Sequence, residues 1–335
     1  MHVGKSYKLS EFLFWTRRSI LWLLLVAAVP TILYAVFDIK WLSVTWPVVA
    51  LLGTAKAFIV GFKNVQTYNR TWEARQIWGA TMSSSRSWAM MCRDFIEDSN
   101  RAREIIYRHF AWLTALRYQL RADRSWETTN KTYNREYKKF YTIPEKETSI
   151  EMELLKYITK EEMTNVLFKN NKAVYLLSLQ SDALKNLYKD ELLDNFRFMG
   201  MHTMLREFSD HQGKSERIKN FPYPRQYATI NTIFVKLFCI LLPFALLGEF
   251  DNLNSAISGA LKGYMGWLVI PFSVMISWVY TSLDQVGEST ENPFEGNAND
   301  VPISQMSRTV EIDIRELLGE TDLPPTLQPQ NNIVL

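Results

Sequence analysis

The apolar run 44–62 carries three side chains at helical spacing, Thr54, Phe58 and Phe62. Residues four apart lie on the same face of a helix, so these three form one stripe. Lys56 lies inside the same run. Ionisable side chains are expensive inside a bilayer, and they mark ion or substrate pathways more often than plain anchors. The run therefore predicts a membrane helix with a function in transport.

The remaining residue chemistry gives no support for catalysis, because the sequence lacks the G-x-S-x-G, Walker, G-x-G-x-x-G and H-E-x-x-H motifs. Cys92 and Cys239 fall in separate predicted helices, so we expect no disulfide between them. A formal net charge of +3 is too small to indicate nucleic acid as a partner. The histidines have no Cys or His partner at metal-ligand spacing: His2, His109, His202 and His211. We expect neither an enzyme nor a metal or cofactor site.

Lys56 and Lys236 both lie in apolar runs, where an unpaired ammonium group is costly. Two interpretations stay open for them. One is a buried structural pair with Asp284 or Glu288, and the other is attraction of anions. Helical geometry places Lys56 about 200° around the helix from Thr54, which favours contact with a neighbouring helix.

Four apolar runs are long enough to cross a hydrocarbon core of about 30 Å. They are Ser19 to Phe37, Val44 to Phe62, Ile230 to Phe250 and Tyr264 to Leu283. They pair into two hairpins on either side of a long polar middle region. The basic residues gather on one side of the spans: Lys5, Lys8, Arg17, Arg18, Lys63, Arg70, Arg75, Arg217, Lys219 and Arg225. The positive-inside rule then predicts that both termini and the middle region are cytoplasmic. The expected location is the cell (inner) membrane.

The predicted fold class is an all-α membrane protein with four transmembrane helices and a helical cytoplasmic region. Within the middle region, 81–94 continues the second membrane helix, and 122–148 forms a loop or insertion on the surface. Beyond the last span, 305–318 is a short amphipathic helix. The tail is expected to be flexible or to dock on a partner. The chain divides into an N-terminal segment 1–18, a transmembrane hairpin 19–63, a cytoplasmic helical region 64–229, a second hairpin 230–283, a C-terminal cytoplasmic segment 284–318 and a tail 319–335.

Three separated blocks resemble the bestrophin family of ion channels, in its bacterial and plant-chloroplast branch. The first block, 61–79, reads GFKNVQTYNRTWEARQIWG, against a family pattern of approximately G-F-R-N-N-x-x-Y-x-R-W-W-E-A-R-x-x-W-G. The second, 216–227, reads ERIKNFPYPRQY, and the third, 292–302, reads NPFEGNANDVP. The blocks occur in the family's order and the match covers nearly the whole chain.

This resemblance implies a homopentamer around one central pore. It places the pore neck at Thr54, Phe58 and Phe62, the same stripe that the spacing identifies, and a cytoplasmic constriction at Phe196. The implied partners are other copies of the chain, the lipid bilayer and small inorganic ions. Residues of an implied assembly and structural network are Asn64, Arg70, Trp72, Glu73, Arg75, Pro293, Phe294 and Asp300.

Several residues depart from the family pattern. Thr54 is polar where the family usually has an aliphatic neck residue, so the outermost ring is expected to be wetter, and Lys56 replaces a usual leucine. Eukaryotic members bind calcium through an acidic run after Pro-Phe. Here Glu295 is followed by Gly, Asn, Ala and Asn, which supply too few carboxylates for a tight site. We therefore expect no calcium activation.

The hypothesis is passive ion conduction, with chloride or another anion favoured because phenylalanine edges carry partial positive charge. Arg70, Glu73 and Arg75 are expected to form a salt-bridge network that holds subunits together. The alternatives are a cation channel of the same fold, a small-molecule carrier or exporter, and a membrane scaffold.

Overall fold

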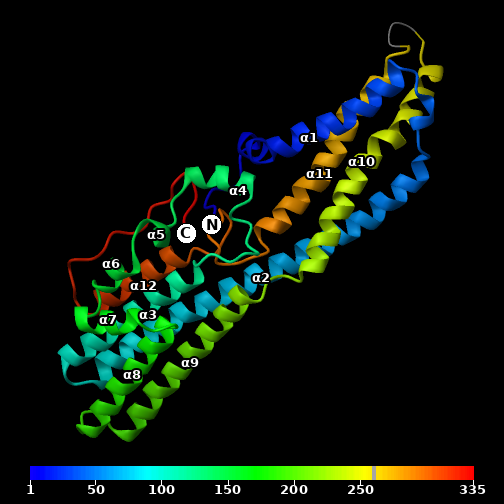
Figure 1. Cartoon of the computed structure of the whole chain (residues 1–335). Helices are drawn as coiled ribbons and strands as arrows, with labels where there is room; N and C mark the ends of the chain where they lie inside the picture. The colour runs from blue at the N-terminus through cyan, green and yellow to red at the C-terminus, as the bar shows by residue number, and fades with distance from the viewer. Residues whose placement is uncertain (259–261) are drawn as a thin grey trace. The chain divides into compact units, whose positions relative to one another are not determined.

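The computed structural model describes residues 1–258 and 262–335, and within these residues every regular element is a helix (Figure 1). The all-α prediction is therefore confirmed. The chain divides into two compact units, which we call the membrane unit (Lys5–Asn69 and Pro222–Glu291) and the extramembrane unit (Met1–Gly4, Arg70–Phe221 and Asn292–Leu335). One long helix, α2 (Trp46–Phe95), contributes residues to both units.

The membrane unit contains the four predicted spans. They lie in α1 (Leu9–Ala35), the first part of α2, α10 (Arg225–Ala256) and α11 (Val269–Ser289). All four are long and apolar enough to cross a membrane. Helices α1, α10 and α11 pack against one another, and a short 3-10 helix, η3 (Met265–Leu268), leads into α11 (Figure 1). A second 3-10 helix, η1 (Lys40–Leu42), separates α1 from α2.

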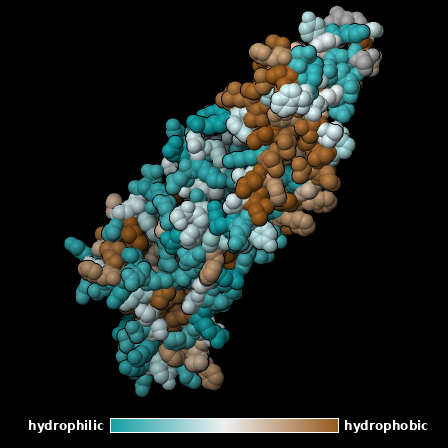
Figure 2. Space-filling model, turned by 45° about the vertical axis from the view of Figure 1, so that its right-hand side comes forward, coloured by the Kyte–Doolittle hydropathy of each residue, from teal (hydrophilic) through white to brown (hydrophobic). Residues whose placement is uncertain are grey.

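Large apolar side chains cover the outside of these helices. Figure 2 shows apolar residues gathered over the membrane unit and hydrophilic residues over most of the extramembrane unit on the face in view. Leu21, Leu25 and Leu51 are each more than half exposed. A soluble domain rarely exposes such a continuous apolar surface, whereas a bilayer provides a solvent for it. The protein is a multi-pass membrane protein.

The helices extend beyond the predicted apolar spans. α1 begins at Leu9, ten residues before the predicted start at Ser19. The predicted continuation of the second membrane helix through 81–94 is confirmed, because α2 continues without a break to Phe95. Apolar runs mark only the part of a helix that lies in lipid, so hydropathy alone underestimates helices that project into water.

The extramembrane unit is a bundle built mainly on α3 (Ser99–Leu120), α8 (Lys172–Lys189) and α9 (Asn195–Asn220), with part of α2. Its core holds Trp88, His109, Trp112 and Phe208, which are all at most 1% exposed. The rings of Trp112 and Phe208 lie 5.1 Å apart, and the indole N–H of Trp112 donates to Gln212 Oε1 at 3.0 Å. Burial lowers the pKa of His109 to about 3, so this imidazole is neutral in the folded protein.

Shorter helices complete this unit. They are α4 (Thr132–Tyr137), η2 (Lys138–Phe140), α5 (Pro144–Glu147), α6 (Ile150–Leu154), α7 (Lys160–Leu167) and α12 (Ile303–Leu317). The last of these confirms the amphipathic helix predicted at 305–318. The segment 122–148, predicted as a loop or insertion on the surface, contains α4, η2 and α5, but it also buries Thr128, Asn134 and Glu145. Its polar composition hid this burial, because each of these side chains has a polar partner inside the protein.

The last three residues of the tail are packed on the same chain. Ile333, Val334 and Leu335 are each at most 4% exposed, and Ile333 and Leu335 pack with Tyr141 and Ile143. Backbone hydrogen bonds join the tail to the first residues of the chain and to α12, including Val3 N to Asn332 O at 2.8 Å. Three buried apolar residues offset the entropy cost of ordering a polar segment, which composition alone did not reveal.

Replacing Trp112 tests the core of the extramembrane unit. Trp112→Ala creates a large cavity and leaves Gln212 without its donor, so we expect a loss of about 3–5 kcal/mol in the free energy of unfolding. Thermal unfolding of the detergent-solubilised protein, followed by size-exclusion chromatography, measures this loss. Phe168→Ala is the matched control, because Phe168 is 83% exposed in the same unit. Equal melting temperatures for both variants would contradict the assignment of Trp112 to the core.

Candidate functional site

The predicted stripe lies along one face of α2 in the membrane unit. Thr54, Phe58 and Phe62 line an open groove, together with other residues of α2. The groove's walls are formed by Phe238 and Leu242 of α10 and by Ile276 and Tyr280 of α11. Phe58 and Phe62 are 64% and 70% exposed, so neither ring is part of the core of the membrane unit.

The hydroxyl of Thr54 is turned back to its own helix. Thr54 Oγ1 donates to the carbonyl oxygen of Ala50 at 3.0 Å. Threonine commonly satisfies its hydroxyl in this way within helices. The side chain can then present its methyl group to the groove, which makes this position less polar than the residue type suggests.

Glycines bring α2 close to its neighbours. A Cβ atom added to Gly53 would lie 2.8 Å from the ring of Phe238, so α10 approaches α2 closely there. About two helical turns further on, Gly61 has no atom within 4 Å of such a Cβ atom. Small residues allow close packing of membrane helices. Gly53 therefore allows α10 to pack closely on α2, whereas the surface at Gly61 is open.

Lys56 lies behind this face, where it contacts α10. It is 1% exposed, and its Nζ atom donates to the backbone oxygen of Asn231 at 2.8 Å and to the side-chain Oδ1 of Asn231 at 2.5 Å. The side-chain amide of Asn231 donates to Asp284 Oδ1 on α11. Lys63, seven residues further along α2, also donates to Asp284 Oδ1, at 2.8 Å. Four buried polar side chains thus tie three membrane helices together.

This arrangement corrects the partner expected for Lys56. The ion pair with Asp284 belongs to Lys63, while Lys56 is held by a neutral amide. Neither Asn231 nor the role of Lys63 was identified from the sequence. An asparagine within an apolar run is a detectable signal, because polar residues in membrane helices mark helix contacts.

The polar segment that follows the groove on α2 contacts the end of α9. Arg70 donates to the backbone oxygens of Ile218 at 3.1 Å and Phe221 at 2.7 Å, and Glu73 accepts from Arg217. Within the described residues Arg75 is exposed and has no ion pair with Glu73. Within one chain Arg70 and Glu73 thus each contact the end of α9. The network of Arg70, Glu73 and Arg75 between subunits stays a prediction.

Three further predicted site residues lie at separate places, Asn64 and Trp72 on α2 and Phe196 on α9. Trp72 is 46% exposed. Asn64 packs its Oδ1 atom against Gly287 of α11, where that buried oxygen accepts no hydrogen bond within the described residues. Phe196, the predicted second constriction, lies in the first turn of α9 and is 88% exposed. Asp194 caps this helix by accepting from the backbone N–H groups of residues 196 and 197.

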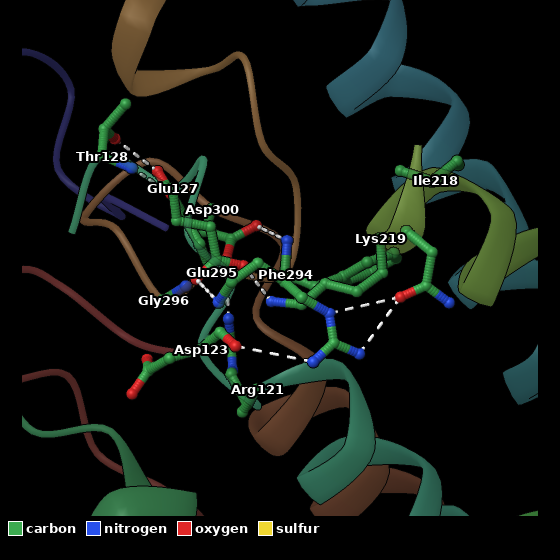
Figure 3. Close-up of polar contacts among 12 residues, drawn as sticks. Arg121, Asp123, Glu127, Thr128, Ile218, Lys219, Phe294, Glu295, Gly296 and Asp300 are labelled. Atoms are coloured by element: carbon green, nitrogen blue, oxygen red, sulfur yellow. Dashed lines mark hydrogen bonds and ion pairs between the residues drawn. The ribbon is translucent and has the colours of Figure 1, made fainter. Parts of the chain in front are cut away.

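The block after α11 forms a tight loop closed by Asp300 (Figure 3). Asp300 Oδ1 accepts from the backbone N–H of Phe294 at 2.8 Å, and Oδ2 accepts from that of Gly296 at 2.7 Å. Phe294 and Gly296 both have positive φ angles, 72° and 88°. The ring of Phe294 is buried near Trp78 of α2, 6.1 Å between centroids, and Pro293 is also buried.

Arg121 completes this loop from the end of α3. Its Nη1 atom donates to Asp300 Oδ2 at 2.6 Å, and both side chains are almost fully buried. A second buried pair, Lys219 with Glu127, lies in the same cluster (Figure 3). Sequence reasoning identified Asp300 but not Arg121 or Glu127, because their partners are more than ninety residues away in the chain.

Glu295 has an unusual environment in this loop. Its carboxyl group accepts from Thr128 N at 2.9 Å, from Thr128 Oγ1 at 2.7 Å and from the side-chain amide of Asn297. It has no basic partner of its own among the described residues. Burial, opposed by the Thr128 hydrogen bonds and aided by Asp300 and Glu127, raises the pKa of Glu295 to about 8. Within the described residues no group of three or more His, Cys, Asp and Glu side chains is arranged to hold a metal ion.

Comparison with known proteins places these features in a family. Residues 15–316 match a family model described as "Bacterial/Fungal Bestrophin protein". A relative from Escherichia coli (strain K12), the "Voltage-dependent anion channel-forming protein YneE", is 28% identical over 286 residues, which are 85% of this chain and 81% of the relative. A similarly named protein of Ralstonia nicotianae is 24% identical over 82% of this chain and 78% of its own length. The crystal structure of a bacterial bestrophin homologue from Klebsiella pneumoniae has a TM-score of 0.75 and 25% identity, covering 91% of this chain and 99% of that one.

The Glu295 carboxyl group predicts a pH dependence of stability. Its folded pKa of about 8 lies above the ordinary value of 4.5, so its stabilising contribution is complete below pH 4.5 and is lost as the pH rises through 8. Glu295→Gln cannot ionise, and we expect it to melt several degrees above the wild type at pH 9 but not at pH 5. Melting curves of the purified protein across this range measure the difference.

Glu147→Gln is the control for this experiment, because Glu147 is an exposed acid in the same unit. A constant difference between wild type and Glu295→Gln from pH 5 to pH 9 would show that Glu295 does not titrate as stated.

Proposed function

The chain belongs to the bacterial and fungal bestrophin family, and on that premise we propose that it is an ion channel through which anions cross the membrane passively. The proposed assembly is a homopentamer around one pore, with both termini in the cytoplasm and the membrane unit in the cell (inner) membrane. The single observation that carries the proposal is the exposed aromatic face of α2, where Phe58 and Phe62 line the groove.

The neck in this proposal consists of rings of Thr54, Phe58 and Phe62, one of each from every subunit. Phe58 and Phe62 are more than 60% exposed in one subunit, so both rings are available to line a shared path. The open surface at Gly61 supports close packing of a neighbouring subunit against α2. Rings of apolar side chains conduct when the path between them is hydrated and close when water leaves it. Phe196 is proposed as a second constriction on the cytoplasmic side.

The choice of anions over cations rests on two arguments. The relatives from E. coli and Ralstonia nicotianae are named as anion channel-forming proteins. Phenylalanine edges carry partial positive charge, so rings that turn their edges to the pore attract anions.

Removing the aromatic rings tests the neck. Purified protein in a planar bilayer with asymmetric KCl should show single-channel steps and a reversal potential near that of chloride. Phe58→Ala and Phe62→Ala widen and wet the constriction, so we expect the conductance to rise by a factor of about two or more.

Phe272→Ala is the matched control, because Phe272 is exposed on α11 in the same unit and lies outside the groove. Unchanged conductance in both neck variants would remove Phe58 and Phe62 from the pore. Saturating flux without single-channel steps would indicate a carrier instead, and a reversal potential near that of potassium would indicate a cation channel.

A further inference from the structure

We propose that Lys56 determines ion selectivity: its buried ammonium group is a fixed positive charge beside the pore, and it favours anions over cations without contacting them. This inference rests on the proposed channel function and adds to it a residue outside the pore-lining stripe.

The position of Lys56 in the helix sets how close its charge lies to passing ions. Lys56 is two residues after Thr54 and two before Phe58, so it lies at the same level of α2 as the proposed neck. An α-helix with its side chains is about 10–12 Å across, so the charge is separated from the neck face by about one helix. Its side chain is directed to α10 and is 1% exposed.

The charge of Lys56 is not cancelled by a carboxylate. Its hydrogen-bond acceptors are the backbone and side-chain oxygens of Asn231, and both are neutral. The nearby carboxylate, Asp284, forms its ion pair with Lys63 at 2.8 Å. Within residues 1–258 and 262–335, no ion pair is made by Lys56. Two ammonium groups and one carboxylate therefore give the cluster a net charge of one positive unit.

The buried charge of Lys56 acts strongly on ions in the proposed neck. Buried charges in a medium of low dielectric constant are screened much less by salt than exposed ones. Each subunit of the proposed assembly contributes one copy at the same height, so their fields add on the pore axis. The phenylalanine rings of the neck carry no formal charge, so a field from behind them is free to set the sign of the permeating ion.

A purely structural role would not require a charge. A well-packed apolar side chain at a buried position is often as stable as a buried ion or more so, and a neutral donor could also bind Asn231. The structural and electrostatic roles can therefore be separated by counting charges in the cluster. Lys56→Met removes one positive charge and keeps an unbranched chain, whereas Asp284→Asn removes one negative charge.

The test is the chloride-to-potassium permeability ratio, measured from reversal potentials of purified channels in planar bilayers. We expect Lys56→Met to lower the ratio roughly three- to tenfold and Asp284→Asn to raise it by a similar factor. The double variant, Lys56→Met with Asp284→Asn, restores the net charge of the cluster and should restore the wild-type ratio. Lys40→Met is the control, because Lys40 is half-exposed in the loop between α1 and α2 and salt screens its charge.

Assembly of each variant is checked by size-exclusion chromatography before recording. If Lys56→Met does not assemble, Asp284→Asn tests the net charge of the cluster in the opposite direction, because it makes the cluster one unit more positive. Ratios that stay at the wild-type value in every assembled variant would overturn the role of Lys56 and leave the channel proposal intact. A wild type that prefers potassium would overturn anion selectivity instead, while a further shift to potassium in Lys56→Met would still support the role of Lys56.

Discussion

The membrane unit depends on one buried interaction, the hydrogen-bonded cluster of Lys56, Lys63, Asn231 and Asp284. Polar groups in a bilayer must find partners inside the protein, because lipid offers none. This cluster satisfies them by joining α2 to α10 and α11 at fixed positions along the helices. Once the lysines face α10 and α11, helical geometry turns Phe58 and Phe62 to the groove. The orientation of the proposed pore face is therefore set from behind it.

In the extramembrane unit, which lies in water, buried polar groups also fix the position of a segment. Asp300 and Arg121 hold the loop 293–300 in a conformation with two positive φ angles, one of them at a non-glycine residue. Such a conformation is unfavourable alone and persists because surrounding bonds impose it. Lys219 and Glu127 form a buried pair in the same cluster. Buried ionic groups in both units thus fix where particular segments lie.

The proposed channel separates three tasks among neighbouring residues of α2. Apolar rings at Phe58 and Phe62 exclude water, small residues such as Gly61 allow neighbouring subunits to approach, and Lys56 supplies a field from the side of the helix away from the pore. A single helix can perform all three because its faces repeat every 3.6 residues. The neck in this proposal carries no formal charge, so an ion does not bind it tightly. Selection between anions and cations then depends on the charge of Lys56, which the ion does not contact.

The sequence by itself determined the four spans, the all-helical class and the Thr54–Phe58–Phe62 stripe, because hydrophobic length and helical periodicity are local properties of a chain. It also identified Lys56 as a residue that needs a partner, and the family resemblance pointed to Asp300 as a structural residue. Only the tertiary structure decided which partners they have. Asn231 rather than Asp284 binds Lys56, and Arg121, from the end of α3, binds Asp300. Partner choice is long-range: it depends on which helix faces meet, and no local pattern in the sequence records it.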